Sequence, residues 1–112
     1  MTDIRHLRET LVARVLDGDG SAPRDQRIAA FRNAGLQSPA LASLVDAVAR
    51  HAYRVTDADV AATIEAAASE DAVFELVVCA ALGEATRQYE AACAALDLAT
   101  HGRDANASRD PR

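Results

Sequence analysis

The chain has 112 residues, the size of one ordinary domain; half of them are apolar and a quarter are charged. This balance is typical of a globular protein and excludes an intrinsically disordered chain. The net charge of -5, reached without a single lysine, argues against nucleic acid and anionic membrane surfaces as partners, because both require clustered basic side chains.

Alanine dominates the apolar half, and only four residues are aromatic: Phe31, Tyr53, Phe74 and Tyr89. Small, unbranched side chains favour helix over strand, so the composition predicts an all-α fold. The sequence shows neither a signal peptide nor an apolar run long enough to span a bilayer. We therefore expect a cytoplasmic protein that does not enter a membrane.

The first two helices are predicted from start and stop signals. An apolar face recurs through residues 3–16, and the run Asp-Gly-Asp-Gly-Ser at 17–21 ends it. A second, shorter helix is expected over residues 23–35, between a proline and a glycine. It should bury Ile28 and Phe31.

The third and fourth helices each begin at a hydroxyl side chain. Ser38, followed by proline, opens a helix that should end near residues 51–53 and bury Leu41, Leu44, Val45 and Val48. Thr56 opens the next one, with Asp59 three residues later in a capping-box-like arrangement. Val60 and Ile64 should face inward there.

The fifth helix begins after Ser69 and carries an almost continuous apolar run over residues 73–82, which predicts that both of its sides are covered. If the helix were unbroken to Ala99 it would be about 45 Å long, far longer than a compact domain of this size. Either it bends near Gly83 or its far half packs on another subunit. We favour the second, because an apolar stripe continues there: Tyr89, Ala92, Cys93 and Leu96.

These elements predict one domain over residues 1–101, a small bundle of about five helices around a long buried central helix. Residues 102–112 have no apolar period and are expected to form a disordered, mobile C-terminal tail.

Cys79 and Cys93 fall on the same predicted helix, fourteen residues apart. That spacing corresponds to roughly 21 Å, whereas a disulfide requires about 6 Å between Cα atoms. Both cysteines are flanked by apolar residues, so we interpret them as small buried hydrophobic side chains.

Metal and cofactor sites are not predicted. In an EF-hand counted from Asp17, Ala22 would occupy the glycine position and Ile28 the glutamate position, so the acidic turn does not match. The three histidines, at 6, 51 and 101, fit no zinc or di-iron spacing. Glycine-rich phosphate loops are absent as well.

The remaining candidates for chemistry are His51, Glu75 and Glu84. Glu84 and Arg87 are neighbours on a helix and can simply form an ion pair. Glu75 stands inside the apolar run, where an unpaired carboxylate is costly, so it needs a partner or contact with water. A carboxylate near a histidine can relay a proton. The competing interpretation is an ion pair that fixes helix packing.

Two segments carry a family resemblance. Residues 51–60 read His-Ala-Tyr-Arg-Val-Thr-Asp-Ala-Asp-Val, and residues 69–87 run from Ser-Glu-Asp-Ala-Val-Phe-Glu to Gly-Glu-Ala-Thr-Arg. Together they resemble the C-terminal part of the alkylhydroperoxidase D-like (AhpD-like) and carboxymuconolactone decarboxylase superfamily. The resemblance covers residues 51–96, and residues 1–50 match only as helices.

The resemblance implies an all-helical bundle that assembles into trimers, hexamers or related rings. The peroxidase members use a Cys-x-x-Cys pair with a nearby histidine on the helix before the Thr-Asp start. Here that helix contains no cysteine, Cys79 lies on the later helix, and His51 lies too near the Thr-Asp start. The redox site is therefore not carried over to this chain.

The sequence thus predicts a non-redox member of this superfamily that acts as an oligomeric accessory or ligand-binding subunit. One alternative is a cysteine-independent acid/base enzyme that uses His51 with a central-helix glutamate, Glu75 or Glu84. Another is a helical protein-interaction module with a second protein as partner.

Overall fold

The structure, a computed structural model, describes residues 3–67 and 69–109. All regular elements in these ranges are helices, which confirms the all-α prediction. In chain order they are α1 (Ile4–Asp17), α2 (Arg24–Arg32), α3 (Pro39–His51), the short 3-10 helix η1 (Ala52–Arg54), α4 (Asp57–Ala67) and α5 (Glu70–Arg109).

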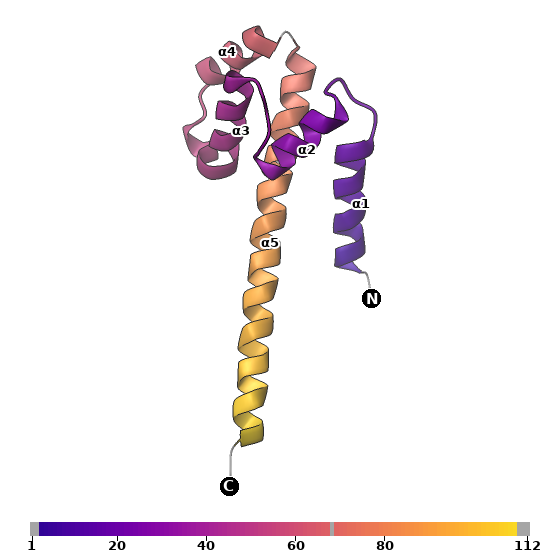
Figure 1. The fold of residues 1–112 in the computed structure, drawn as a ribbon, viewed down its shortest axis with the longest axis vertical. Coiled ribbons are helices and arrows are strands. Elements are labelled where there is room, and N and C mark those ends of the chain that lie inside the picture. The colour runs from indigo at the N-terminus through magenta and orange to yellow at the C-terminus, as the bar shows by residue number, and fades with distance from the viewer. Residues whose placement is uncertain (1–2, 68, 110–112) are drawn as a thin grey trace.

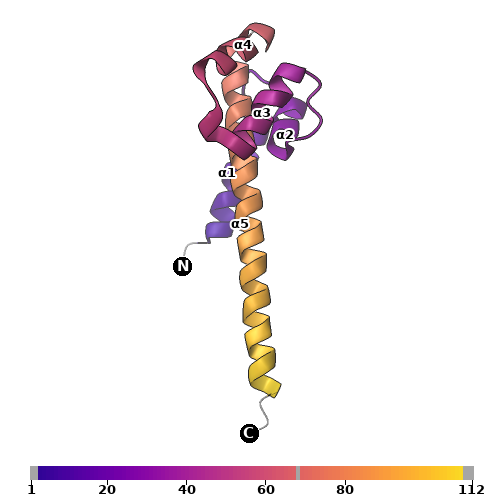
Figure 2. The same ribbon diagram turned by 90° about the vertical axis from the view of Figure 1, so that its left-hand side faces the viewer.

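Helix α5 is the axis of the molecule (Figure 1). Helices α2, α3 and α4 gather around its N-terminal end, and α1 runs antiparallel beside its middle (Figures 1 and 2). The far half of α5 projects beyond them. The overall dimensions are 69 × 29 × 22 Å, and the radius of gyration is 18.7 Å, whereas a compact chain of this length has about 13 Å.

The predicted helix starts are confirmed by their caps. Asp3 and Ser38 each accept a hydrogen bond from a backbone N–H in the first turn of α1 and α3. Thr56 and Asp59 form the reciprocal capping box, with distances of 3.1 and 3.2 Å. Ser69 accepts from the first turn of α5 at 3.1 Å.

Helix α2 ends one turn earlier than predicted, at Arg32. Asn33 adopts the left-handed conformation with φ of 54°, and its N–H bonds the last carbonyls of the helix. Gly35, at φ of 93°, belongs to the connection toward α3 rather than to the helix. The left-handed residue therefore stops the helix before the glycine does.

The buried side of α2 also differs from the prediction. Arg27 and Ala30 are buried, while Ile28 and Phe31 are only half-buried. Arg27 is buried because carbonyl groups of the preceding turn bind its guanidinium, as described below.

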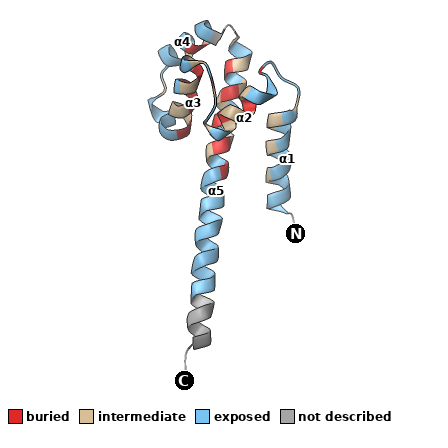
Figure 3. Ribbon diagram, viewed as in Figure 1, coloured by how far each residue is buried: buried red, intermediate tan, exposed pale blue. Residues whose placement is uncertain are grey.

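The core lies where α2 and α3 meet the first part of α5 (Figure 3). Leu41, Leu44 and Val45 of α3 are buried as predicted, whereas Val48 is half-buried. Val60 and Ile64 of α4 pack against this cluster from its edge. The largest side chains of the cluster with less than 2% exposure are Leu76, Val45, Val73 and Cys79.

The prediction of a long central helix buried on both sides is wrong. In the apolar run of α5, Phe74 is 67% exposed and Val78 is 37% exposed. Over residues 70–102, for which burial is described, the buried residues of α5 lie from Val73 to Thr86, on the face that contacts α2 and α3. Of the described helices, only α1 approaches the opposite face, across a cavity that Phe74 and Val78 line.

Helix α5 does not end or break at Gly83. Gly83 is buried against the backbone of Phe31, and a Cβ on this residue would overlap the Phe31 carbonyl oxygen. The glycine thus permits α2 and α5 to cross closely. The helix continues past His101 to Arg109, where an irregular tail was expected; residues 110–112 lie outside the described residues, and the mobility of the segment stays a prediction.

Candidate functional site

Glu75 of α5 holds the turn that follows α1. Its carboxylate accepts hydrogen bonds from the backbone N–H groups of Ser21, at 2.8 Å, and Ala22, at 2.9 Å. These hydrogen bonds, the one from Ala22 first, lower the pKa of Glu75. A Cβ on Gly20 would lie 2.5 Å from the Glu75 carboxylate, so a larger residue there would displace this side chain.

Arg27 of α2 binds the same turn from the other side. Only 8% of this residue is exposed, and its Nη1 donates to the carbonyl oxygens of Val15, at 3.2 Å, and Gly18, at 2.6 Å. Its charge also contributes to the lowered pKa of Glu75. Both charged groups are therefore bound to backbone atoms of the turn and fix α1 to the rest of the molecule.

A cavity of about 220 Å³ opens beside these two residues, between α1 and α5. Its lining combines charged and apolar side chains: Arg14, Val15, Asp19, Arg27, Phe74, Glu75 and Val78. The two acidic and two basic groups balance in charge, which leaves the apolar part, Val15, Phe74 and Val78, as its distinctive feature.

Glu84 forms the ion pair that the sequence predicts, with Arg87 at 3.1 Å. Gln88 donates a further hydrogen bond to Glu84 at 3.0 Å, and Arg87 also donates to the carbonyl oxygen of Phe31 at 2.7 Å. The hydrogen bonds from Gln88 and then Arg87 lower the pKa of Glu84. This pair links α5 to the C-terminal end of α2.

His51, the third candidate, is exposed at the C-terminal end of α3. Its ring lies edge-on to Tyr53, with 6.2 Å between the ring centroids. His51 lines neither the cavity that contains Glu75 nor the cavity of about 390 Å³ that contains Glu84 and Arg87. The structure thus does not bring the three predicted residues into one pocket.

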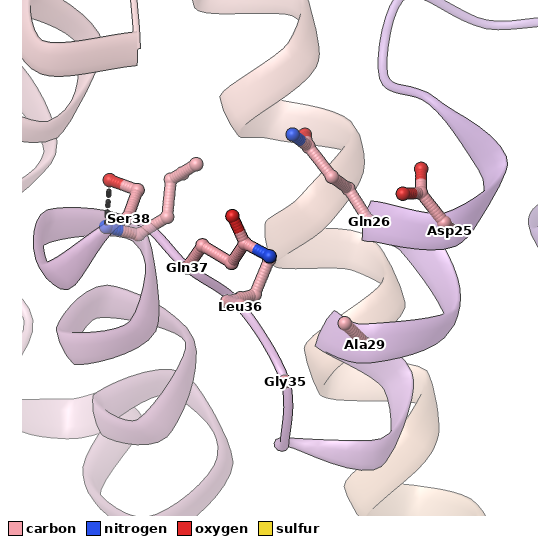
Figure 4. Close-up of a pocket in the computed structure, with 8 residues that line it drawn as sticks. Asp25, Gln26, Ala29, Gly35, Leu36, Gln37 and Ser38 are labelled. Atoms are coloured by element: carbon pink, nitrogen blue, oxygen red, sulfur yellow. Dashed lines mark hydrogen bonds between the residues drawn. The ribbon is translucent and has the colours of Figure 1, made fainter.

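A further cavity, of about 180 Å³, lies between α2 and the connection to α3 (Figure 4). Asp25 is its one titratable lining residue, and the Ser38 hydroxyl is bound to the α3 backbone. The other lining residues are Gln26, Ala29, Gly35, Leu36, Gln37 and Leu41. It contains none of the three predicted residues.

The two cysteines lie in different environments. Cys79 is fully buried, and burial raises the pKa of its thiol. Cys93 is exposed, so the prediction that both are buried is wrong for this residue. It lies in the part of α5 that no other described element covers. Within the described residues, no group of three His, Cys, Asp or Glu side chains is placed to hold a metal ion.

The most extensive unusual surface is apolar and runs along α5. Exposed apolar residues recur there every three or four positions, close to the helical period of 3.6, so they share one face. This face lies opposite the buried residues Val73, Leu76 and Ala80. We call it the α5 stripe; it consists of Phe74, Val78, Ala81, Ala85, Tyr89, Ala92, Leu96 and Ala99.

Helix α1, which lies beside α5, carries further exposed apolar side chains. None of its residues is buried, and Ile4, Leu7 and Leu11 are 66%, 56% and 50% exposed. Arg8 anchors it to α5, since its guanidinium lies 5.0 Å from the centroid of the Tyr89 ring.

The sequence indicates only part of this surface. The part of the α5 stripe beyond Gly83 can be predicted from the spacing of apolar residues. Phe74 and Val78 cannot be assigned to one face in this way, because nearly every residue around them is apolar. The exposure of the apolar residues of α1 cannot be predicted from the sequence, because it depends on where α1 lies beside α5.

Comparison of the chain with models of protein families, with curated proteins and with solved structures finds no match in any of the three. Among the described helices, none has an apolar stretch of the length needed to cross a bilayer.

Proposed function

We propose that this chain is a non-redox, self-assembling accessory subunit, and that the α5 stripe and α1 form its association surface. The observation that carries the proposal is the exposed apolar face of α5, which continues from Phe74 through Leu96 to Ala99. A large exposed apolar patch is typical of a protein interaction site.

The size of the surface supports a stable contact. Seven large apolar side chains on it are between 37% and 67% exposed: Ile4, Leu7, Leu11, Phe74, Val78, Tyr89 and Leu96. If an interface covers roughly 100 Å² of each, the total is roughly 700 Å² per subunit. That value is close to the ~800 Å² per partner of an ordinary specific interface, before the alanines are included.

The relationship to the AhpD-like and carboxymuconolactone decarboxylase superfamily is part of the proposal. Two features support it: the capping box at Thr56 and Asp59, and the following helix that begins after Ser69. The burial of Cys79 and the single exposed Cys93 support a non-redox role, because a thiol peroxidase needs an accessible thiolate and a resolving thiol.

The acid/base alternative receives less support from the geometry. Glu75 and Glu84 are both engaged in hydrogen bonds that favour their charged forms, whereas a general acid needs a raised pKa. His51 lies apart from both, beside Tyr53. The enzymatic role stays a prediction.

The proposal is tested by the mass of the protein in solution. Replacement of Tyr89 and Leu96 by glutamate should dissociate the assembly, because an interface that buries these charges is strongly penalised. Size-exclusion chromatography with light scattering should give a multiple of 11.8 kDa for the wild type and 11.8 kDa for the variant.

Leu98→Glu is the matched control. Leu98 is 75% exposed and equally apolar, but it lies two residues from Leu96, about 200° around the helix. This variant should keep the wild-type mass. A wild-type monomer, or a Tyr89→Glu/Leu96→Glu variant of unchanged mass, would refute the proposal.

A further inference from the structure

We infer that the partner of the α5 stripe is the α5 stripe of a second copy, paired antiparallel about a two-fold axis near Thr86 and Arg87. The inference rests on the proposed function and adds the orientation and register of the contact. It follows from the distribution of large and small side chains, from the position of α1, and from the charges beside the stripe.

The first argument is steric. An antiparallel pair centred between residues 86 and 87 places Phe74 opposite Ala99 and Tyr89 within one residue of the level of Ala85 of the second copy. Ala81 and Ala92 then face each other and permit close approach of the helices. Each bulky aromatic ring thus meets a small residue, as interdigitating helix packing requires. A parallel pair in register would instead place Phe74 against Phe74 and Tyr89 against Tyr89.

The second argument concerns the part of the α5 stripe that projects beyond the other helices. In the described chain, α1 lies beside α5 only as far as its middle, and every described side chain beyond Thr86 is exposed. Antiparallel pairing brings Leu96 of each copy level with Val78 of the other, over the cavity between α1 and α5. The projecting half of one α5 thus covers the apolar groove of its partner, and α1 and α5 of the two copies form four helices around one core.

The third argument is electrostatic. In this register Asp97 comes level with Leu76 of the second copy, next to the cavity that Arg14 lines. Both side chains are exposed, and neither forms a salt bridge within the described part of the chain. Antiparallel pairing therefore brings Asp97 and Arg14, which carry opposite charges, to nearby levels along the paired helices. Parallel pairing in register would instead bring Asp97 level with Asp97 of the second copy, which is unfavourable.

Disulfide trapping tests this arrangement. In a Cys93→Ser background, which removes the exposed thiol, two chains are prepared that carry either Ala81→Cys or Ala92→Cys. Mild oxidation should cross-link them when they are co-expressed, because the two positions face each other. Neither chain should cross-link alone, since Ala92 of one copy lies roughly 16 Å along the axis from Ala92 of the other, beyond disulfide reach.

The controls separate this inference from the proposed function. Leu98→Cys, used in place of Ala92→Cys, should give no cross-link. If each single-cysteine chain cross-links with itself, the pairing is parallel; if the mass is a multiple of 11.8 kDa but no cross-link forms, the register is wrong. Both results overturn the inference and leave self-assembly intact. A monomeric mass overturns both.

Discussion

Gly83 of α5 lies directly against the main-chain carbonyl of Phe31 in α2, with no room for a Cβ between them. This contact sets the closest approach of the two helices and therefore the position of α2 along α5. Arg87, one turn further on, donates to the same carbonyl oxygen at 2.7 Å. The two residues together fix where α2 ends on α5.

Gly83→Ala should therefore destabilise the fold. The added methyl group meets backbone atoms that cannot move aside, and overpacking of this kind costs about 2 kcal/mol. For a chain of this length the melting temperature should fall by roughly 8 °C, which circular dichroism can measure. Gly102→Ala is the control, since a Cβ there meets nothing within 4 Å; its melting temperature should be unchanged or slightly higher. Equal effects of the two substitutions would contradict the close crossing.

Glu75 should make stability depend on pH in the acid range. Hydrogen bonds from Ala22 and Ser21 hold its pKa below the ordinary value of 4.5, so its carboxylate contributes stability above that value. The contribution is lost as the pH falls through the lowered pKa of the folded state. In urea unfolding between pH 7 and pH 3, Glu75→Gln should reduce stability near neutrality and lose less of it on acidification than the wild type. The control is Glu65→Gln, at an exposed position, which should leave the dependence of stability on pH as in the wild type. If the stability of Glu75→Gln falls with pH as steeply as that of the wild type, the Glu75 carboxylate does not have this role.

The thiol of Cys79 should be unreactive in the folded protein. The thiol is fully buried and its pKa is raised, so little thiolate is available to react. A thiol reagent should label Cys79 only as fast as the chain unfolds, and the protein should not turn over peroxide. Peroxide consumption that disappears in Cys79→Ser but persists in Cys93→Ser would contradict both the burial and the non-redox role.

Removal of residues 102–112 should leave the fold and the assembly intact. The described core lies before Thr86 and the α5 stripe ends at Ala99, so truncation after His101 removes no residue assigned to either. The melting temperature should stay within about 3 °C, less than the effect of 1 kcal/mol at this length, and the mass should change only by the residues removed. A large drop would show that this segment packs on the body or on a neighbouring subunit.

Much of the fold is predictable from local signals. Asp3, Ser38, Thr56 and Ser69 mark four of the helix starts, because each side chain caps the first turn within its own segment. The end of α2 is less predictable, since the left-handed residue that ends the helix is Asn33. Glycine usually has this conformation at a helix end, and Gly35 stands two residues later.

The candidate site is less predictable because it depends on tertiary contacts. Nothing near Glu75 in the sequence indicates that Ser21 and Ala22, more than fifty residues away, donate to its carboxylate. Likewise, an arginine within an amphipathic helix is normally solvent-exposed, whereas Arg27 is buried by the carbonyl groups of the turn before it. Phe74 is exposed because too few helices surround α5 to cover its whole circumference. The number of surrounding helices cannot be predicted from the spacing of apolar residues in the sequence.

Sedimentation equilibrium of the unmodified chain is the most direct measurement of self-assembly. Antiparallel pairing of the α5 stripe predicts a mass of twice 11.8 kDa, or an even multiple of it, that declines toward 11.8 kDa on dilution. A mass of 11.8 kDa throughout the micromolar range and up to the highest soluble concentration would contradict it, because the exposed face from Phe74 to Ala99 would then have no second copy to cover it.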